Sequence, residues 1–401
     1  MTASTAALHT ATARSSTPPP LDTLRVALVH DWLTGMRGGE YVLEAILELF
    51  PQAELFTLIK DSSSIQGPLA EQTCHTSWLQ SIPRSTKNYR QFLPLMPTMI
   101  ESFDLTGFDL IISSSHCVAK GIRKPPSSVH VSYIHAPMRY IWDRYDDYFG
   151  AHTASLPVRV AASMVRGYLQ DWDRRSSAED RLDAIMANSQ FIAQQIHAVY
   201  GRKSEVVHPF VDFKRFDLPR RLSNFYLMVG AFAPNKRVDL AIETFNELGL
   251  PLKIVGKGQE ERRLKRLAGG NVEFLGPLSN REIEQLYSEA RAFIFPGVED
   301  FGITPLEAMA SGLPVIAYAA AGALETVIHG RTGLLFDAQT IQSLGDAVLK
   351  VERGEATFNE EELRQHAAQF SKARFQTEFM RCVRAAWSEH WTPEKSRAAV
   401  A

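Results

Sequence analysis

Residues 296–315, "PGVEDFGITPLEAMASGLPV", connect one apolar run to a helical segment and then to the next apolar run. The run "AFIFPG" (292–297) is typical of a strand covered on both faces, because its apolar residues are continuous rather than alternating. Thr304 is a preferred N-cap residue and Glu307 follows it by three positions, which predicts a capping box. Gly312 predicts the end of that helix. The stretch therefore predicts a strand, a short helix and a second strand in succession.

The same alternation of apolar runs and helical patterns extends through most of the chain. The strand candidates form two series: 24–32, 53–59, 108–115, 129–135, 182–189 and 205–211, then 225–232, 252–258, 271–278, 292–297, 314–320 and 333–337. Strands that alternate with helices pair in parallel within doubly wound sheets. The sequence therefore predicts two Rossmann-like α/β domains that face a cleft, with ligands at the carboxyl ends of the strands.

The domain boundaries follow from length and local composition. A chain of 401 residues is longer than one compact α/β core usually needs, which favours two domains. The Ser-, Thr-, Ala- and Pro-rich start predicts a disordered leader over 1–22. The polar stretch around Pro219 separates an N-terminal Rossmann-like domain, 23–215, from a C-terminal Rossmann-like domain, 216–375. Residues 376–401 are expected to form a helix that crosses back towards the N-terminal domain.

Composition limits the classes of function. Hydrophobic residues make up 45% and charged residues 22% of the chain, which is ordinary for a globular protein. The formal net charge of −2 provides no basic field for nucleic acid. Cys74, Cys117 and Cys382 fit neither a disulfide framework nor a zinc spacing, which favours a cytoplasmic setting. No apolar window has the length of a membrane-spanning helix, so we expect no crossing.

Two acids lie around a glycine in the opening stretch. Glu299 and Glu307 are eight positions apart, with Gly302 between them. A helix N-terminus next to such a glycine offers free N–H groups to an anion, and carboxylates accept hydrogen bonds from vicinal hydroxyls. A sugar nucleotide carries both features, an anionic diphosphate and vicinal hydroxyl groups. The capping box alone would explain Glu307 but leaves Glu299 unexplained.

The string "E-D-F-G-I-T-P-L-E-A-M-A-S-G-L-P-V-I-A" resembles the E-x7-E signature of retaining glycosyltransferases with the two-Rossmann-domain (GT-B) fold, the large family four. The resemblance covers about 24–336. It implies that Glu307 holds the nucleotide ribose and that Glu299 lies near the donor hexose. It further assigns backbone contacts with the hexose and diphosphate to Phe301, Gly302 and Ile303.

Further donor-binding residues are implied by the same resemblance. Lys236, in the first turn of a predicted helix, matches a family lysine that neutralises the donor diphosphate, although a solvated lysine is the alternative. The partner arginine of the family is replaced by Ala231, so Arg237 or a first-domain residue is expected to supply that charge. Gly256 and Gly258 would line the base pocket, or simply form a turn.

The first domain supplies two more glycines and a histidine. Gly38 and Gly39 resemble the family loop that closes over the donor diphosphate, with a plain turn as the alternative. His135 ends a predicted strand, where the family carries a functional histidine near the hexose; a structural hydrogen bond is the alternative.

The string "YIHAPMRYIWD" (133–143) resembles a subgroup that makes bacterial polysaccharides, often from GDP-mannose. Arg139, Trp142 and Asp143 are therefore candidates for acceptor binding. Residues 77–100 mix aromatic, aliphatic and basic side chains, which suits peripheral contact with the inner face of a membrane or a core-packed helical hairpin. Membrane contact would suit a polyprenyl-diphosphate-linked acceptor.

Together, these features predict a retaining hexosyltransferase of polysaccharide biosynthesis. His135, Glu299 and Lys236 would be catalytic, GDP-mannose the donor and a glycan or lipid-linked hydroxyl the acceptor, and no metal is expected. The leaving phosphate would take the acceptor proton, as the family implies. Two alternatives remain: a glycoside hydrolase that uses the two carboxylates, and a non-catalytic sugar-nucleotide-binding partner of a polysaccharide assembly complex, which Ala231 favours.

Overall fold

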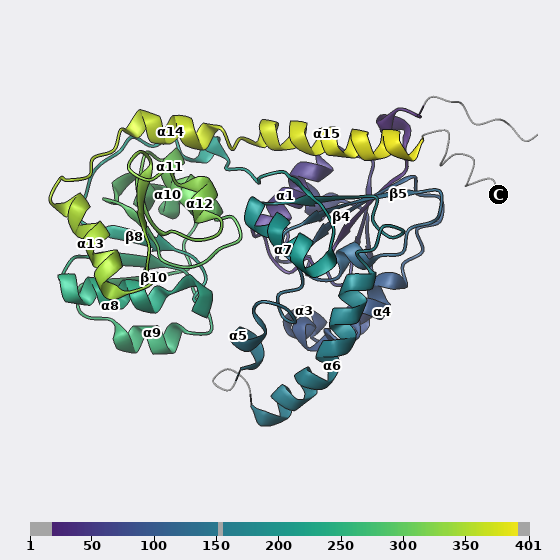
Figure 1. The fold of residues 1–401 in the computed structure, drawn as a ribbon, viewed down its shortest axis with the longest axis horizontal. Helices are drawn as coiled ribbons and strands as arrows, with labels where there is room; N and C mark the ends of the chain where they lie inside the picture. Colours follow the sequence, from purple (N-terminus) through teal and green to yellow (C-terminus); the bar gives the residue numbers. More distant parts are fainter. Residues whose placement is uncertain (1–17, 151–154, 392–401) are drawn as a thin grey trace, which may run out of the picture.

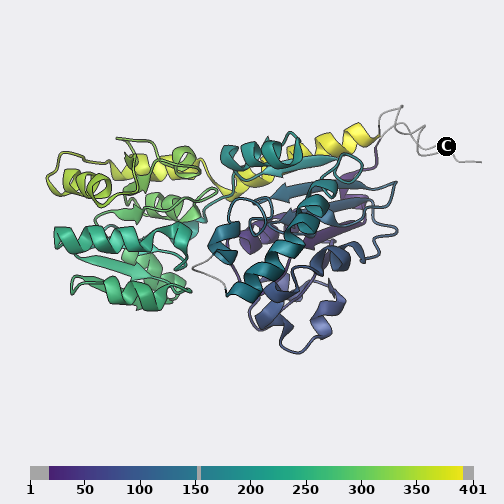
Figure 2. The same cartoon turned by 60° about the horizontal axis from the view of Figure 1, so that its bottom comes forward.

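The computed structural model describes residues 18–150 and 155–391. They form two α/β domains that lie side by side and are joined by two crossings of the chain (Figures 1 and 2). The predicted leader falls largely on residues 1–17, and the end of the predicted C-terminal segment falls on 392–401, both outside the described residues.

The first domain contains a seven-stranded sheet in the order β3-β2-β1-β4-β5-β6-β7, and every neighbouring pair is parallel. Its strands are β1 (Val26–His30), β2 (Glu54–Thr57), β3 (Cys74–Thr76), β4 (Leu110–Ser115), β5 (Val129–Ile134), β6 (Ala184–Ala187) and β7 (Glu205–Val206). Its helices are α1 (Gly38–Leu47), α2 (Pro68–Glu71), α3 (Ser85–Asn88), α4 (Met96–Glu101), α5 (Tyr145–Phe149), α6 (Leu156–Arg175) and α7 (Gln190–Tyr200).

The second domain contains a six-stranded parallel sheet in the order β10-β9-β8-β11-β12-β13. Its strands are β8 (Tyr226–Val229), β9 (Leu252–Val255), β10 (Val272–Gly276), β11 (Phe293–Phe295), β12 (Val315–Tyr318) and β13 (Gly333–Phe336). Its helices are α8 (Val238–Leu248), α9 (Glu261–Leu267), α10 (Asn280–Glu289), α11 (Ile303–Ala310), α12 (Ala323–Thr326), α13 (Ile341–Glu352) and α14 (Glu360–Ala368). The predicted fold class is confirmed.

The burial of the strands explains why they appear in the sequence as continuous apolar runs. Every residue of β1, β4 and β5 is buried, because helices cover both faces of the sheet. Strand β3 was not predicted, since its three residues are partly or fully exposed and carry little apolar signal. Within the described residues no helix combines the length and apolarity that a bilayer crossing requires.

Each sheet has one place where successive strands are added on opposite sides. In the first sheet this switch lies between β1 and β4, and in the second it lies between β8 and β11. The loops that leave these strands diverge, which opens a crevice at the carboxyl ends of the strands. The sequence-predicted residues Lys236 and Glu299 follow β8 and β11, so both belong to such a crevice.

Helix α15 (Lys372–His390) runs back along the first domain (Figure 1). Phe375 and Phe379 belong to the core cluster that also contains Leu28 and Val131 of the first sheet. Next to its start, the Val211 N–H donates to the carbonyl of Phe370 over 3.0 Å. The two crossings between the domains are therefore hydrogen-bonded to each other.

Candidate active site

A cavity of about 480 Å³ lies between the domains at the two switch points. The first domain contributes Gly39, His135 and Arg139 to its lining, among others, and the second contributes Lys236, Glu299 and Gly302. The structure therefore brings together all three residues that the sequence suggested as catalytic.

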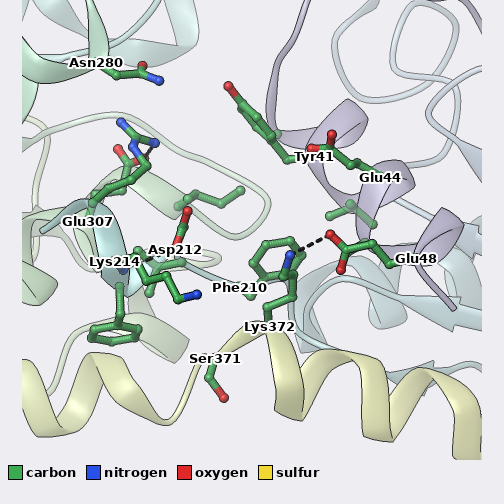
Figure 3. Close-up of a pocket in the computed structure, with 17 residues that line it drawn as sticks. Tyr41, Glu44, Glu48, Phe210, Asp212, Lys214, Asn280, Glu307, Ser371 and Lys372 are labelled. Atoms are coloured by element: carbon green, nitrogen blue, oxygen red, sulfur yellow. Dashed lines mark hydrogen bonds and ion pairs between the residues drawn. The ribbon is translucent and has the colours of Figure 1, made fainter. Parts of the chain in front are cut away.

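A second cavity of about 360 Å³ adjoins the first (Figure 3). Gly38, Val42 and Ile303 line both cavities, so the two spaces are adjacent. Glu307 lines the second cavity, so the two glutamates of the E-x7-E string serve neighbouring spaces.

Glu299 and Lys236 form an ion pair across two loops of the second domain. Lys236 Nζ lies 2.5 Å from Glu299 Oε1, and the Asn235 amide donates to the same oxygen over 3.0 Å. A Cβ at Gly297 would lie 2.4 Å from the Asn235 carbonyl oxygen, so only glycine allows the loops to approach this closely. Gly297 thus allows the Lys236 ammonium to lie against the Glu299 carboxylate.

The expected position of Lys236 in the first turn of α8 is wrong. Lys236 ends a separate 3₁₀ turn, Pro234–Lys236, and Arg237 has a left-handed φ of 50° before α8 begins at Val238. This kink turns the two basic side chains apart. Arg237 contacts Asp239 at 3.2 Å and Gln339 at 3.2 Å, and it lines neither cavity.

The predicted capping box between Thr304 and Glu307 is also wrong. Helix α11 begins two residues earlier than expected, and its N-cap is Gly302, with a φ of 88° and no side-chain cap. Because glycine tolerates this left-handed conformation, the helix can start directly after the sharp loop. The carboxylate of Glu307 is consequently left for other partners.

Glu307 faces the second cavity from inside the second domain. Its carboxylate accepts a hydrogen bond from the Tyr287 hydroxyl over 3.2 Å and lies 3.6 Å from an Arg215 guanidinium nitrogen. Burial raises the pKa of Glu307, and the Arg215 charge opposes that rise. Figure 3 shows the carboxylate near Asn280 and Lys214 on the side of the cavity opposite Tyr41.

The backbone between the two glutamates lies against the cleft. The ring of Phe301 is buried and stacks on His208 with centroids 5.3 Å apart, so only its main chain can reach a ligand. Across the cleft, a Cβ at Gly38 would lie 3.1 Å from Ile303 Cδ1. The first-domain glycine loop therefore contacts the start of α11 directly.

His135 belongs to a hydrogen-bonded chain at the ends of β1, β4 and β5. Its Nε2 lies 2.9 Å from Ser114 Oγ, and the same hydroxyl lies 3.2 Å from His30 Nδ1. Burial, together with neighbouring His116 and His30, holds the pKa of His135 well below its usual range. The imidazole facing the cavity is therefore neutral at physiological pH.

Asp31 organises this part of the first domain. Its buried carboxylate accepts four backbone N–H groups of 116–119 at 2.5 to 3.0 Å, and His116 Nδ1 lies 3.1 Å away. Burial raises the pKa of Asp31, while His30 and the backbone donors oppose the rise. The carboxylate fixes the loop after β4 to the end of β1.

Sequence reasoning missed His30, Asp31, Ser114 and Arg37. The available signal was the placement of polar residues directly at the ends of otherwise apolar strands, in "LVHDW" and "IISSSH". Arg37 is exposed next to the start of α1 and lines the larger cavity. Arg139 lines the same cavity and forms an ion pair with Asp300 of the second domain.

The predicted base-pocket glycines, Gly256 and Gly258, line neither cavity. A Cβ at Gly256 would lie 1.9 Å from the Gly230 carbonyl oxygen, and one at Gly258 would lie 2.4 Å from that of Phe232. Both glycines allow the loops after β8 and β9 to pack, as the simple-turn alternative implies.

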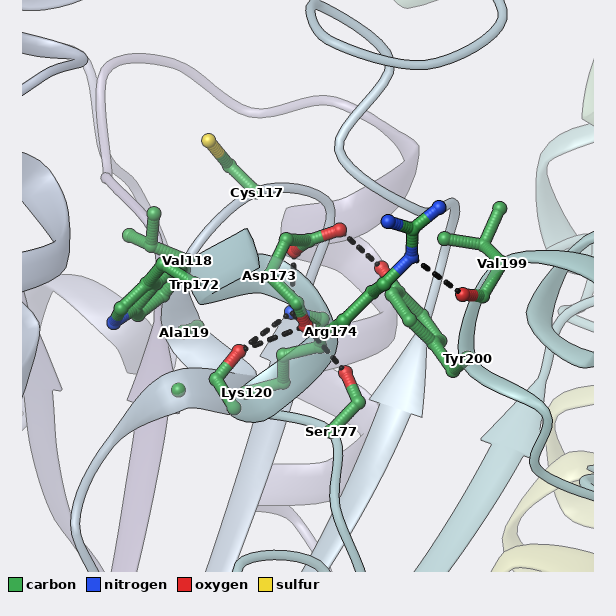
Figure 4. Close-up of polar contacts among 12 residues, drawn as sticks. Cys117, Val118, Ala119, Lys120, Trp172, Asp173, Arg174, Ser177, Val199 and Tyr200 are labelled. Carbon is green, nitrogen blue, oxygen red and sulfur yellow. Dashed lines mark hydrogen bonds and ion pairs between the residues drawn. The ribbon is translucent and has the colours of Figure 1, made fainter. Parts of the chain in front are cut away.

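The structure does not bring Trp142 or Asp143 to either cavity. The Trp142 indole donates to Asp173 over 2.7 Å, and Asp143 is exposed with its carboxylate 4.0 Å from Arg144. Asp173 is itself buried and pairs with Lys120 at 2.6 Å. Figure 4 shows this pair. The Tyr200 hydroxyl also donates a hydrogen bond to the Asp173 carboxylate, and these contacts fix the C-terminal half of α6.

The 77–100 segment folds into short turns and helices rather than a helical hairpin. Leu79, Tyr89, Met96 and Ile100 are buried in the first-domain core, whereas Trp78 is exposed. Within residues 18–150 and 155–391, no group of three or more His, Cys, Asp or Glu side chains could hold a metal ion.

Glu325 connects the domains beside the cavities. Its carboxylate accepts the N–H groups of Gln190 and Phe191, at the start of α7, over 2.8 and 3.1 Å. His208 Nε2 lies 2.8 Å from the same carboxylate. Despite partial burial, these hydrogen bonds lower the pKa of Glu325.

Comparison with solved structures supports the fold. A structure of Anabaena HepE in complex with UDP and glucose has a TM-score of 0.65, with 16% sequence identity over 90% of this chain and 99% of that chain. Both proteins thus share the arrangement of two facing Rossmann-like domains, the GT-B fold.

The chain spans about half or less of the length of two relatives that it resembles. An uncharacterized glycosyltransferase of Methanocaldococcus jannaschii is 29% identical over 199 residues, which are 47% of this chain and 55% of the relative. A GDP-mannose-dependent alpha-(1-6)-phosphatidylinositol monomannoside mannosyltransferase of Mycobacterium tuberculosis is 37% identical over 116 residues, 26% of this chain and 30% of the relative. The second domain carries the family match: residues 211–374 fit the model of the glycosyl transferases group 1.

Proposed function

We propose that this protein is a retaining glycosyltransferase that moves a hexose from a nucleotide diphosphate to a hydroxyl of a glycan or lipid-linked acceptor. The observation that carries the proposal is the adjacency of the two cavities. Glu307 lines one and Glu299 lines the other, while Gly38 and Ile303 line both. A nucleoside next to Glu307 and a hexose next to Glu299 would place the diphosphate between them, at the start of α11.

The proposed chemistry depends on stabilising charge on the leaving diphosphate. Lys236 and the N-terminal N–H groups of α11 would face that charge, and electrostatic stabilisation of this kind is often the largest catalytic contribution. Because Ala231 provides no charge, we assign the second cation to Arg37 or Arg139, which line the same cavity. Arg237 is the weaker candidate, since it contacts Asp239 instead.

Neutral His135 would hold the hexose by a hydrogen bond rather than by charge. Glu299 is paired with Lys236, so donor binding would separate the pair: the ammonium would turn to phosphate and the carboxylate to sugar hydroxyls. The leaving phosphate oxygen would take the acceptor proton. Since protein cations neutralise the diphosphate, we expect transfer without a metal and unchanged activity in excess EDTA.

Mannose from GDP-mannose is the proposed donor sugar, in line with the resemblance of 133–143 and with the named mycobacterial relative. The HepE structure contains UDP, which makes a uridine nucleotide the main competitor. We place the reaction in bacterial cell-envelope polysaccharide synthesis, at the cytoplasmic side of the inner membrane, with no nucleic-acid partner.

The direct test is a thermal-shift screen of GDP-, UDP- and ADP-sugars. A donor at 100 times its dissociation constant should stabilise the native state by about 2.7 kcal/mol. NMR of the product should then show the anomeric configuration of the donor. Binding of a donor without transfer to any acceptor would favour the non-catalytic partner, and sugar release without nucleotide would favour the hydrolase.

A further inference from the structure

An apolar groove of about 410 Å³ opens on the first domain beside the candidate active site. Its walls are the segment after η3 (Tyr89–Phe92), which includes Leu93 and Met96, and one side of α6. This volume lies within the range of about 300–1,000 Å³ that is usual for ligand pockets. Among the described lining residues Arg90 is charged and none is acidic.

The groove adjoins the larger active-site cavity. Tyr140 and Tyr148 line both spaces, and their rings are 4.7 Å apart. A molecule whose polar end reaches His135 and Glu299 could therefore extend between the two cavities past these rings.

Helix α6 has two contrasting halves. Its C-terminal half is fixed by the buried pair of Lys120 and Asp173 (Figure 4). Its N-terminal half extends below the body of the first domain in Figure 1 and is the teal helix on the face turned forward in Figure 2. Between 155 and 170 it contains no acidic residue.

Two apolar stripes run along the N-terminal half of α6. One stripe lines the groove: Val158, Ala161, Ala162, Val165 and Leu169. The other faces outward, and its members Leu156, Val160, Met164 and Tyr168 are between 46% and 72% exposed. A helix that is apolar on both sides is normally buried or placed against hydrocarbon, so exposure here needs a nonpolar occupant.

We propose that this groove binds the hydrocarbon chain of an amphiphilic acceptor whose sugar or phosphate end lies in the active-site cavity. The inference rests on the proposed function and specifies its acceptor class. Three observations favour a lipid chain over a soluble glycan or a second copy of this chain: the adjacency of the two spaces at Tyr140 and Tyr148, an apolar lining without acids, and the exposed outer stripe.

The test compares two phosphates that share a headgroup and differ in chain length. Farnesyl phosphate, below its micelle concentration, and isopentenyl phosphate are titrated into the full-length protein by calorimetry. Each buried methylene should strengthen binding about fourfold. Farnesyl phosphate should therefore bind at least about tenfold more tightly than isopentenyl phosphate.

Two neighbouring substitutions on α6 provide a matched pair. Ala162→Trp fills the groove and should weaken farnesyl phosphate binding at least about tenfold. Ser163→Trp adds the same side chain one position away, outside the groove lining, and should leave the affinity within about twofold. Both sites lie on the exposed half of the helix, and circular dichroism checks that the variants remain folded.

Equal affinities for the two phosphates, or an unchanged affinity in Ala162→Trp, would overturn the proposal. Sedimentation that shows a wild-type dimer dissociated by Ala162→Trp would overturn it as well, in favour of a second copy. The thermal-shift screen on the same samples separates the two hypotheses. Farnesyl phosphate binding without nucleotide-sugar binding would reject the transferase but retain the groove, and the reverse result would reject only the groove.

Discussion

The two rims of the cleft are built differently. The second-domain rim consists of the loop after β11 and the start of α11, where functional residues such as Glu299, Gly302 and Glu307 lie close together in sequence. The first-domain rim is a buried platform in which His30, Ser114 and His135 come from three different strand ends. The comparison teaches that local patterns reveal the second-domain rim, whereas the groups that support His135 in the first-domain rim appear only when the sheet is assembled.

The largest expected effect concerns the second-domain rim. Lys236→Met should lower kcat by about 10²–10³-fold, because loss of one preorganised group that stabilises developing charge has a cost of this size. Initial rates at saturating donor provide the measurement. Arg237→Met is the matched control, since that side chain contacts Asp239 and should change kcat little. Equal losses of kcat in the two variants would contradict the role assigned to Lys236.

Acid should affect the first domain more than the second. His30 and His130 are fully buried in the first sheet, and burial lowers their pKa values to about 4 and about 3, whereas strands β8–β13 contain no histidine. The unfolded chain takes up these protons first, so stability present above about pH 6.5 is lost as the pH falls towards 4. At pH 5 each of these two histidines should lower the free energy of unfolding by about 1–2 kcal/mol.

Tryptophan fluorescence offers a selective probe of this difference. All six tryptophans lie in the first domain or at the end of the chain near α15, and none lies between 211 and 370. Thermal unfolding followed by fluorescence should shift to lower temperature between pH 8 and pH 5 more than unfolding followed by far-UV circular dichroism. The raised pKa values of Asp31, Glu40 and Glu44 act in the opposite direction, whereas the lowered pKa values of His116 and His135 add to the effect. Identical shifts of the unfolding temperature in the two signals would show that acid destabilises both domains equally.

A smaller effect is expected for the support of His135. Ser114→Ala removes the hydroxyl between His135 and His30, and loss of one hydrogen bond of about 1 kcal/mol corresponds to roughly a fivefold change in rate. Ser114→Thr, which retains the hydroxyl, should restore activity. If alanine acts only through stability, the fall in kcat should vanish at low temperature, and the positioning role would be rejected.

The smallest effect concerns backbone strain beside the second-domain rim. Ala321 has a left-handed φ of 50°, which glycine tolerates without a penalty. Ala321→Gly should therefore stabilise the protein by about 0.5–1 kcal/mol. The neighbouring Ala320→Gly serves as control and should be neutral or destabilising, as urea midpoints would show. A loss of stability in both variants would mean that the strain is absent.

Strand positions and fold class could be predicted because buried parallel strands leave continuous apolar runs in the sequence. Glu299, Lys236 and His135 could be placed for the same reason, since each follows a strand end. The capping box at Thr304 was wrong because the left-handed Gly302 starts α11 earlier. The partners of Asp31 lie 85 to 88 residues away and have no local signature.

The backbone hydrogen bond between Val211 and Phe370 limits how the two halves of the molecule can move. Both interdomain segments meet at this point, so the halves can pivot there but cannot slide apart without breaking it. The pivot lies on the α14–α15 side in Figure 1, and α5 and α6 lie on the opposite side. A rotation about this point would separate the two domains most on the side of α5 and α6, and the Arg139–Asp300 ion pair would have to break for it.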